Sequence, residues 1–486
     1  MLEMDARLVA GKIISELGHE PTGGQIEAID LISSFIARAD QPKHLHAFML
    51  KGYAGTGKTT LVSALVRVLP LAGMQSVLLA PTGRAAKVLG GYSRKQAFTI
   101  HRKIYRASQN SDGKLQMTLA ANPHKFTLFI VDEASMIPGP TASADQGIYS
   151  HRDILEDLIT YIYKSEGCRL LLIGDGAQLP PVGDELSPAL NAEYLRNLYH
   201  LDIDSYELSE VVRQSLDSGV LANATMLRQF ANVEKPTPPF FNLNGFADIK
   251  KIDGAEFEDS LNSCYSRFGV ENTAIITRSN KRANLFNNEV RARMLFRETE
   301  LSAGDIIMIT KNNYFWLPKG SKAGFIANGD MAEVRRIRNI SEMYGFRFAE
   351  ITIQLLDYPD EGVIEIKLLL DSMNAVSASM PQEEIKKLYD EILLDYTEIS
   401  PASARVEKVK TSPFYNAVQA KFAYSLTCHK TQGGQWDAVF IDHGYLTDEM
   451  IDSSFMKWLY TAVTRTAKEL YLVNFKESFF EETQSK

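Results

Sequence analysis

Cysteine is scarce in this chain of 486 residues, which holds three, Cys168, Cys264 and Cys428, far apart and odd in number. A disulfide framework needs paired cysteines and a zinc site needs closely spaced ones, so neither is predicted. No apolar run approaches the length of a membrane span, and the N-terminus lacks the apolar segment of a signal peptide. We therefore expect a protein of a reducing, cytoplasmic compartment without a membrane anchor.

Positive charge is not in excess either, because the net charge is −8 at pH 7. Phosphate-binding proteins tend to be basic, so this balance argues mildly against a nucleic-acid partner, although a local groove can be positive on an acidic protein. The hydrophobic content of 45% and the charged content of 23% are those of an ordinary soluble globular protein. The length suffices for about two to four domains.

A complete phosphate-binding loop is present at residues 52–59, which read GYAGTGKT. Glycines let the backbone wrap a polyphosphate, Lys58 supplies positive charge to the β- and γ-phosphates, and the Thr59 hydroxyl can hold Mg²⁺. An apolar run precedes the loop and a helical pattern follows it, the setting that places phosphates at a helix N-terminus. The nucleotide contacts expected here are Gly52, Ala54, Gly55, Thr56, Gly57, Lys58, Thr59 and Thr60.

A second half of a nucleotide site follows at residues 127–133, an apolar run that ends in two carboxylates. Asp132 is placed to hold Mg²⁺ and Glu133 to polarise an attacking water. Together with further apolar runs at 76–80 and 169–173, this pattern predicts a mostly parallel, doubly wound α/β sheet. Gln178 lies just past a strand tip, where its amide could sense a γ-phosphate; a solvated loop glutamine is the alternative.

The motifs taken together resemble those of superfamily 1 helicases. The matching segments, for motifs I, Ia, Ib, II, III, IV, V and VI in that order, are residues 52–60, 79–87, 99–101, 131–136, 174–182, 208–214, 426–433 and 459–465. Residues 21–25 resemble the Q motif, whose glutamine, here Gln25, reads adenine. The resemblance implies an ATP hydrolase with two RecA-like parallel-sheet motor lobes.

Two motifs favour one branch of this superfamily. Residues 179–182 (LPPV) and 429–433 (HKTQG) are similar to the RecD and phage Dda helicases and differ from the UvrD/Rep branch. Asp112-Gly113 is a hairpin turn signal in the short stretch before motif II. A β-hairpin there would resemble the strand-separating pin of the RecD/Dda branch, and movement from 5′ to 3′ on single-stranded DNA is likewise implied by the resemblance.

The expected domain boundaries follow the same pattern. Lobe 1 is expected at residues 1–200, with the pin at 102–122, and lobe 2 at 201–300 and 414–486. Between 301 and 413 the α/β alternation gives way to short strand-like segments, which resemble the small all-β barrel inserted in lobe 2 of RecD/Dda helicases.

One segment of this insert has a helical pattern and not a strand-like one. Residues 382–396 form a more helical and acidic stretch with an apolar stripe. The stripe either packs on its own domain or binds a partner.

The resemblance also implies the site residues of an ATP-dependent DNA helicase. Its catalytic set is Lys58, Asp132, Glu133, Gln178, Arg213 and Arg465, with the two arginines entering from lobe 2; Gly433 is a further nucleotide contact, and Thr59 and Asp132 are the metal ligands. The DNA contacts implied are Pro81, Thr82, Phe98, Thr99, His101, Asn280, Thr427 and His429.

Some residues keep a second interpretation. Phe98 and Trp436 are candidates for base stacking, with core packing as the alternative. His101 could contact phosphate or a base, or could be solvated or satisfied locally.

The implied partners are single-stranded DNA and forked duplex DNA, with a monomer as the expected working unit. Two other classes of function remain: a P-loop ATPase that remodels protein or signals, and a non-catalytic module with a degenerate helicase fold. Motifs Ia, V and VI argue against the first of these, and the intact catalytic positions argue against the second.

Overall fold

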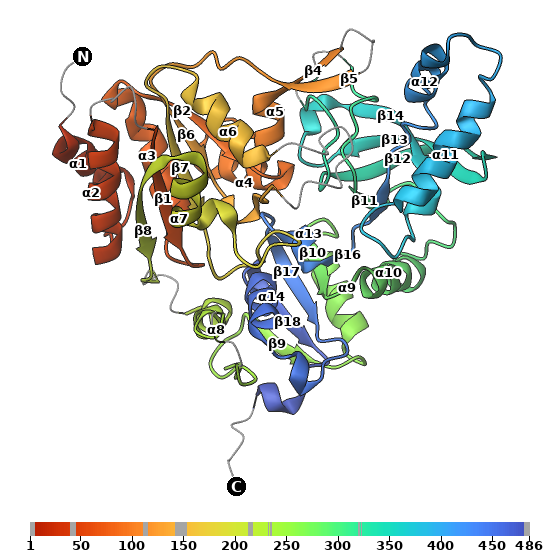
Figure 1. Ribbon diagram of the computed structural model, residues 1–486. Helices are drawn as coiled ribbons and strands as arrows, with labels where there is room; N and C mark the ends of the chain where they lie inside the picture. Colours follow the sequence, from red (N-terminus) through yellow and green to blue (C-terminus); the bar gives the residue numbers. More distant parts are fainter. Residues whose placement is uncertain are drawn as a thin grey trace.

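The computed structural model describes residues 5–38, 45–109, 115–140, 153–211, 217–231, 233, 236–318, 321 and 323–480. Two α/β lobes and a mainly β-stranded body meet at a common junction (Figure 1). Within these described ranges, no helix is long and apolar enough to cross a membrane.

Lobe 1 is built on six parallel strands in the order β3-β2-β6-β7-β1-β8. Side chains alternate between its two faces: Phe48 and Leu50 point to one buried cluster, and Ala47 and Met49 to another. Helices cover both faces, so the central strands are apolar throughout. The strands are β1 (Leu45–Gly52), β2 (Gln75–Ala80), β3 (Ala97–Thr99), β6 (Thr127–Val131), β7 (Arg169–Gly174) and β8 (Leu201–Leu208). The helices are α1 (Ala6–Glu16), α2 (Gly23–Ala37), α3 (Lys58–Val68), α4 (Gly83–Ser93), α5 (Ile100–Ile104), α6 (Ile154–Tyr163) and α7 (Ala192–Tyr199).

Lobe 2 repeats the plan with five parallel strands in the order β16-β10-β17-β18-β9. The strands are β9 (Ile249–Ile252), β10 (Thr273–Thr277), β16 (Ser425–Thr427), β17 (Trp436–Asp442) and β18 (Thr466–Val473). The helices are α8 (Gly219–Arg228), α9 (Phe257–Phe268), α10 (Asn280–Glu289), α13 (Cys428–Thr431) and α14 (Ser453–Val463). The prediction of an α/β protein with two parallel-sheet lobes is thus confirmed.

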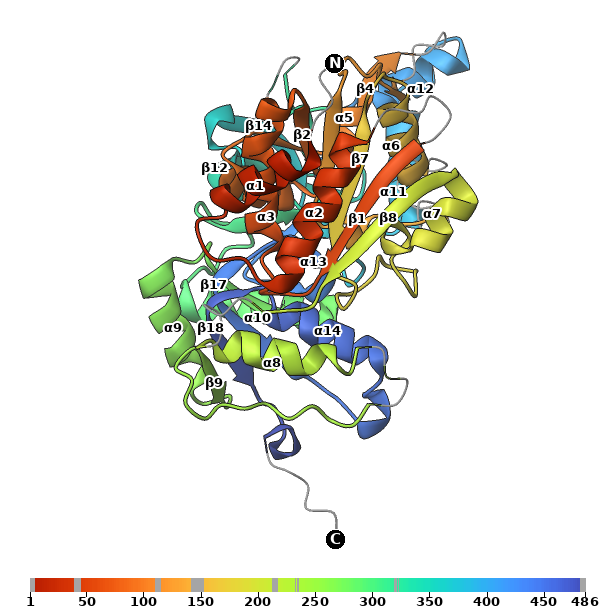
Figure 2. The same ribbon diagram turned by 90° about the vertical axis from the view of Figure 1, so that its left-hand side faces the viewer.

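One predicted boundary is wrong at the end of lobe 1. Strand β8 pairs with β1 from Leu45–Leu201 to Gly52–Leu208, so it belongs to the first sheet and not to lobe 2 (Figure 2). The reason is its position at the sheet edge: exposed and buried residues alternate along β8, so it lacks the continuous apolar run that identifies the inner strands.

The insert, which lies between the two segments of lobe 2 in the sequence, forms an antiparallel sheet in the order β14-β13-β12-β11-β15. An isolated parallel bridge joins Leu368 of β14 to Val418, just before β15. The strands are β11 (Ile306–Ile309), β12 (Met331–Met343), β13 (Phe346–Leu355), β14 (Val363–Leu369) and β15 (Ala420–Phe422). The predicted end of this insert at residue 413 is therefore wrong: β15 is only three residues long, too short to be recognised from its sequence.

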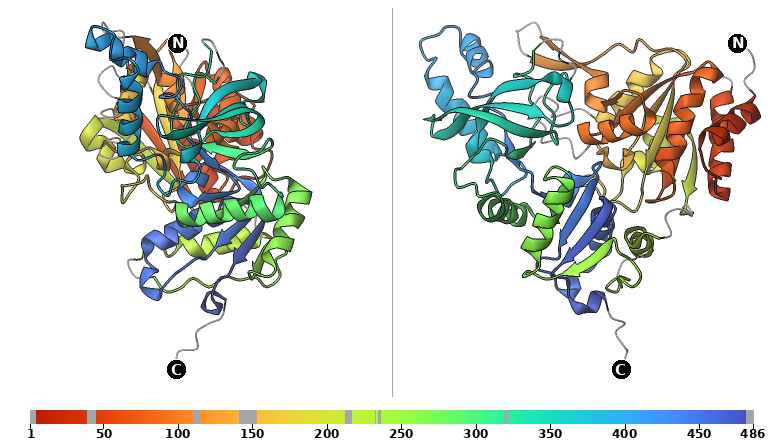
Figure 3. Two further views of the ribbon diagram at one scale, coloured as in Figure 1. Left: turned by 90° about the vertical axis from the view of Figure 1, so that its right-hand side faces the viewer. Right: turned by 180° about the vertical axis from the view of Figure 1, so that it is seen from behind.

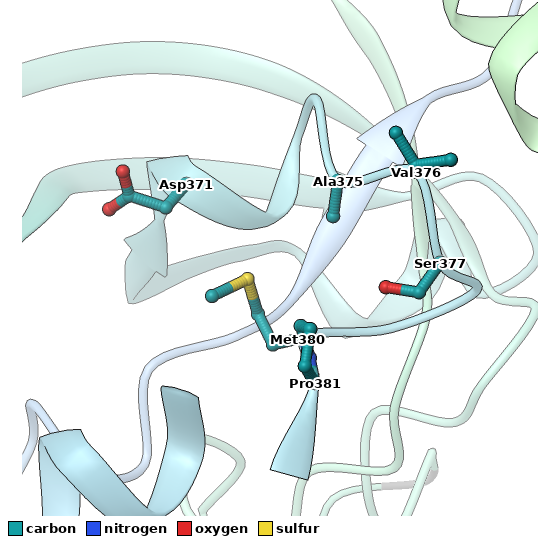
Figure 4. A pocket seen from close by; sticks show the side chains of 6 residues that line it. All are labelled: Asp371, Ala375, Val376, Ser377, Met380 and Pro381. Carbon is teal, nitrogen blue, oxygen red and sulfur yellow. The ribbon is translucent and has the colours of Figure 1, made fainter. Parts of the chain in front are cut away.

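Two helices, α11 (Gln382–Leu394) and α12 (Ala402–Lys410), lie on the outer side of this sheet (Figure 3). Leu388 and Ile392 of α11 are buried in one cluster with Phe346 and Phe348. Of the two interpretations of the apolar stripe, packing on its own domain is the one observed. An open hollow beside α11, lined by Asp371, Ala375, Val376, Ser377, Met380 and Pro381, belongs to the insert and not to the phosphate-binding loop (Figure 4).

A two-stranded antiparallel hairpin, β4 (Tyr105–Gln109) and β5 (Leu115–Leu119), extends from α5 beside the insert (Figure 1). Its strands pair from Tyr105–Leu119 to Gln109–Leu115. The predicted turn at Asp112-Gly113 lies outside the described residues.

The chain returns from the insert to lobe 2 through only two residues, Ala423 and Tyr424. Asn287 of α10 fixes this crossover: its Nδ2 donates to the carbonyls of Phe422 and Ser425, both at 3.0 Å, and its Oδ1 accepts from the N–H groups of Tyr424 and Ser425 at 3.0 and 2.8 Å. Asn287 is 2% exposed. The crossover is therefore held directly in front of the motif V segment.

Candidate active site

The phosphate-binding loop joins the end of β1 to the start of α3, as predicted. Gly55 and Gly57 have φ of +76° and +82°, which side-chain-bearing residues rarely adopt. A Cβ on Gly52 would lie 2.9 Å from Thr56 Oγ1. The glycine positions are thus required by the shape of the loop itself.

Lys58 lies at the start of α3 and folds back over the loop. Its Nζ donates to the carbonyl oxygens of Gly52 at 2.6 Å and Tyr53 at 2.9 Å. Thr59 is half-buried beside it, and Thr60 is exposed. The ammonium group therefore lies against the first two residues of the loop, within the segment that would bind phosphate.

Asp132 and Glu133 follow the last residue of β6. Asp132 Oδ1 accepts from the N–H of Glu133 at 2.9 Å. Burial and the neighbouring Glu133 carboxylate raise the pKa of Asp132 to about 6, while Lys58 acts in the opposite direction. The Asp132 carboxylate and the Thr59 hydroxyl are oxygen ligands of the kind that suit Mg²⁺.

Arg465 reaches this centre from lobe 2. Its Nη1 lies 3.8 Å from Glu133 Oε1. Bonds within lobe 2 hold the guanidinium: Nε donates to Thr461 O at 3.1 Å, and Nη1 to Gly434 O at 3.3 Å. The structure thus brings together the predicted carboxylate and one predicted arginine. The other predicted arginine, Arg213, lies outside the described residues.

Tyr460 is a residue of this centre that the sequence did not single out. Its hydroxyl accepts from the N–H of Ala54 at 2.9 Å and donates to Asp175 Oδ2 at 2.6 Å. Burial raises its pKa well above the usual range. A neutral hydroxyl inside a helical motif carries no sequence signal comparable to that of a loop glycine or an arginine.

The two glutamines of the predicted site are both buried. Gln178 is 7% exposed, and within the part of the chain that the structure describes its Oε1 has no hydrogen-bond partner. A solvated loop glutamine is therefore ruled out. Gln25 Nε2 donates to Thr56 O and its Oε1 accepts from the N–H of Thr22, both at 3.1 Å, which ties the start of α2 to the phosphate-binding loop. Its contact with adenine stays a prediction.

Gly433 lies where the lobes approach each other. A Cβ on this residue, whose φ is +72°, would come within 2.7 Å of Ala85 Cβ and 3.2 Å of Thr82 Oγ1. Its close neighbours are thus at the start of α4, and its contact with nucleotide stays a prediction.

Trp436 lies at the same interface and does not face solvent. It is 2% exposed, and the Arg84 guanidinium stacks over it at 3.9 Å from the ring centroid. Its interpretation as a base-stacking aromatic is therefore wrong, and core packing is observed instead. Phe98 is half-buried, with Lys103 Nζ at 5.1 Å and the Arg102 guanidinium at 5.5 Å from its ring centroid.

The residues implied as DNA contacts lie at the carboxyl ends of parallel strands in both lobes, the edge where α/β sheets bind ligands. They are Pro81 and Thr82 after β2, Phe98, Thr99 and His101 at β3 and α5, Asn280 after β10, and Thr427 and His429 at β16 and α13.

Their accessibility differs. His429 is exposed, whereas Thr99 is 4% exposed and caps α5 by accepting from the N–H of Arg102 at 3.2 Å. Burial lowers the pKa of His101 to about 4, so this imidazole is neutral at pH 7.

Known proteins resemble this chain in both lobes. Residues 41–232 match the family described as AAA domain, and residues 422–473 match the family described as UvrD-like helicase C-terminal domain. The ATP-dependent DNA helicase dda of Enterobacteria phage T4 is 23% identical, across 93% of this chain and 99% of the phage protein. This chain is a superfamily 1 helicase of the RecD/Dda-like branch. In this helicase, the segment that matches the AAA domain family extends past the end of β8, consistent with the place of that strand in lobe 1.

Two further relatives resemble the helicase. The ATP-dependent RecD2 DNA helicase of Deinococcus radiodurans is 32% identical over 28% of this chain, but the match covers only 16% of that protein. Among solved structures, a Bacteroides Pif1 helicase in complex with ADP-AlF3 and single-stranded DNA aligns with a TM-score of 0.47 at 15% identity, over 96% of this chain and 95% of that chain.

Proposed function

We propose that this helicase hydrolyses ATP to move from 5′ to 3′ along single-stranded DNA and to separate the duplex ahead of it. The observation that carries the proposal is the approach of Arg465 in lobe 2 to Glu133 in lobe 1. A nucleotide site completed by both lobes couples hydrolysis to their relative movement, which a motor needs and a simple nucleotide-binding module does not.

The roles in hydrolysis follow from chemistry and position. Lys58 and the loop amides hold the phosphates, and Glu133 orients the attacking water. Arg465, with Arg213, neutralises charge on the transferring phosphoryl group, an effect worth about 10³–10⁵ in rate. Thr59 and Asp132 would hold Mg²⁺, whose charge offsets that of the phosphates.

The DNA strand would run across the carboxyl ends of the strands of both sheets. Threonine and asparagine side chains, such as Thr82, Asn280 and Thr427, can bond phosphates without reading sequence. Phe98 would stack on a base, since the residue is only half-buried. His101 would contact phosphate or a base as a neutral imidazole. Closure of the cleft on ATP and its release after hydrolysis would move one lobe along the strand relative to the other.

The domain assignment is part of the proposal. Lobe 1 comprises residues 1–208, lobe 2 residues 209–300 and 425–486, and the insert residues 301–422. The β4–β5 hairpin acts as the strand-separating pin. The Leu368–Val418 bridge supports a closed barrel, because it brings both edges of the five-stranded sheet together. The proposed working unit is a cytoplasmic monomer.

Unwinding of forked substrates with opposite single-stranded overhangs tests the proposal. We expect unwinding from a 5′ overhang, ATPase activity that rises manyfold with single-stranded DNA, and DNA binding that weakens with salt. Unwinding from a 3′ overhang alone would refute the direction. An ATPase indifferent to DNA and RNA would favour a P-loop ATPase that remodels protein or signals.

A further inference from the structure

The Tyr460 hydroxyl joins three parts of the molecule at one buried point. Tyr460 belongs to α14 of lobe 2, Ala54 to the phosphate-binding loop, and Asp175 to the loop that follows β7 in lobe 1. Tyr460 and Asp175 are each 1% exposed. The second Asp175 oxygen, Oδ1, accepts from the N–H of Ala177 at 2.9 Å. A single side chain from lobe 2 thus bonds both nucleotide-facing loops of lobe 1.

The loop after β7 is held by lobe 2 at its far end as well. The N–H of Leu179 donates to Thr461 Oγ1 at 2.8 Å, and Gln432 Nε2 donates to Leu179 O at 2.7 Å. Gln178 lies between these anchors and Asp175. Any shift of α14 relative to lobe 1 therefore acts on the segment that carries Gln178.

The chemistry of the contact makes it costly to lose. A buried carboxylate needs hydrogen-bond donors, and a hydroxyl bonded to a charged oxygen is among the stronger ones. Phenylalanine would keep the Tyr460 ring and remove only this donor and acceptor. The N–H of Ala54 would lose the hydroxyl partner at the same time, while Lys58 and the amides of the α3 N-terminus would stay in place to bind phosphate.

We infer that Tyr460 is a positioning residue that couples the phosphate-binding loop to lobe 2 through Ala54 and Asp175, and that it sets Gln178 and Arg465 for hydrolysis. Arg465 follows the same helix, five residues after Tyr460. The inference rests on the proposed ATP hydrolysis and deepens it. Tyr460 would be the group that transmits closure of the lobes to Gln178 and Arg465, beside the attacking water.

The first test compares Tyr460→Phe with a matched control. Tyr344→Phe removes another tyrosine–aspartate bond, from the Tyr344 hydroxyl to Asp395 Oδ2 at 2.5 Å within the insert. We expect Tyr460→Phe to lower the DNA-stimulated kcat about 10- to 100-fold. The KM for ATP should stay within about twofold, since the phosphate contacts remain. Tyr344→Phe should match wild type.

A double variant tests the route of the effect. If Tyr460 acts through Asp175, adding Tyr460→Phe to Asp175→Asn should lower kcat little further, because the two groups act as a unit. Full additivity of the two losses would refute this route.

Hydrogen exchange gives a readout that does not need activity. In nucleotide-free protein, a peptide covering residues 52–57 should exchange faster in Tyr460→Phe than in wild type, because the N–H of Ala54 loses its acceptor. Tyr344→Phe should leave this peptide unchanged.

Each contrary result has a distinct meaning. Unchanged kcat and unchanged exchange would overturn the inference. A KM for ATP lowered several-fold at constant kcat would overturn it as well, since the hydroxyl would then compete with nucleotide. If wild type did not hydrolyse ATP, the proposed function would fail, and the exchange experiment would still decide whether Tyr460 holds the loop.

Discussion

Arg465 Nη1 and Glu133 Oε1 lie 3.8 Å apart across the cleft between the lobes. The arginine side chain is 5% exposed and the glutamate 22%, so solvent screens this pair only partly. Because lobe 2 carbonyls hold the guanidinium, separation of the lobes would carry it away from Glu133. The distance between these two atoms is therefore a measure of how closely the lobes approach each other.

Lys58→Ala should abolish ATP hydrolysis and leave the fold intact. Among the residues that the structure describes, the Nζ atom bonds only to carbonyls of its own loop, so its loss removes a charge needed for phosphate and little packing. We expect kcat to fall by more than about 100-fold, with a melting temperature close to that of wild type. Turnover at the wild-type rate would remove Lys58 from its assigned role.

Glu133→Gln should retain ATP binding while turnover stops. The substitution is nearly isosteric and removes only the charge that faces Arg465, to which we assign the orientation of the attacking water. Binding of a fluorescent nucleotide and single-turnover hydrolysis separate these two properties. Undiminished turnover in this variant would show that another group orients the water.

The hairpin should be needed for strand separation and not for movement. Replacing residues 106–117 with a short glycine linker should spare DNA-stimulated ATPase and reduce unwinding of a forked duplex. A wedge needs only rigid placement at the fork, so two short strands suffice. Normal unwinding by the linker variant would refute the pin while leaving the motor intact.

Substitutions of Trp436 and Phe98 should affect different properties: the stability of the fold for Trp436 and the binding of single-stranded DNA for Phe98. Trp436→Ala removes a buried ring stacked by Arg84, and we expect a loss of about 3–5 kcal/mol in the free energy of unfolding. Phe98→Ala should cost less stability and weaken binding of single-stranded DNA by about 1–3 kcal/mol. Thermal melting and fluorescence anisotropy measure the two effects; the reverse pattern would contradict both assignments.

Asp330 should make stability depend on pH. It is 1% exposed, and its Oδ1 lies 2.6 Å from where a Cβ on Gly83 would be. Burial, with Asp357 adding to it, raises the pKa of Asp330 to about 7, whereas the Ala327 N–H and Arg102 act in the opposite direction.

An unfolded aspartate titrates near about 3.9. Between about pH 4 and 7 the folded state therefore holds a proton that the unfolded state lacks, and stability falls as pH rises through this window. Asp330→Asn should raise the melting temperature by about 2–4 °C at pH 8 and change it little at pH 5. An equal shift at both pH values would contradict this origin.

Features with a distinctive residue type were predictable from the sequence. The glycines and Lys58 of the phosphate-binding loop, and the carboxylates that follow an apolar strand, each serve a local requirement that the sequence alone displays. Edge strand β8 and the short β15 lack such a pattern. The bond between Tyr460 and Asp175 joins residues 285 positions apart, and neither polar group has a local pattern that names its partner.

The two-residue crossover at Ala423 and Tyr424 also has a mechanical consequence. Two extended residues span at most about 7 Å, and Asn287 removes what slack they have. A pull on the insert therefore reaches β16 and the motif V loop as tension along the backbone, and Asn287 passes part of it to α10. If the insert met resistance at a fork, the force would reach Gln432. Through the bond from Gln432 to Leu179 it would then reach the loop that carries Gln178, beside the proposed nucleotide site.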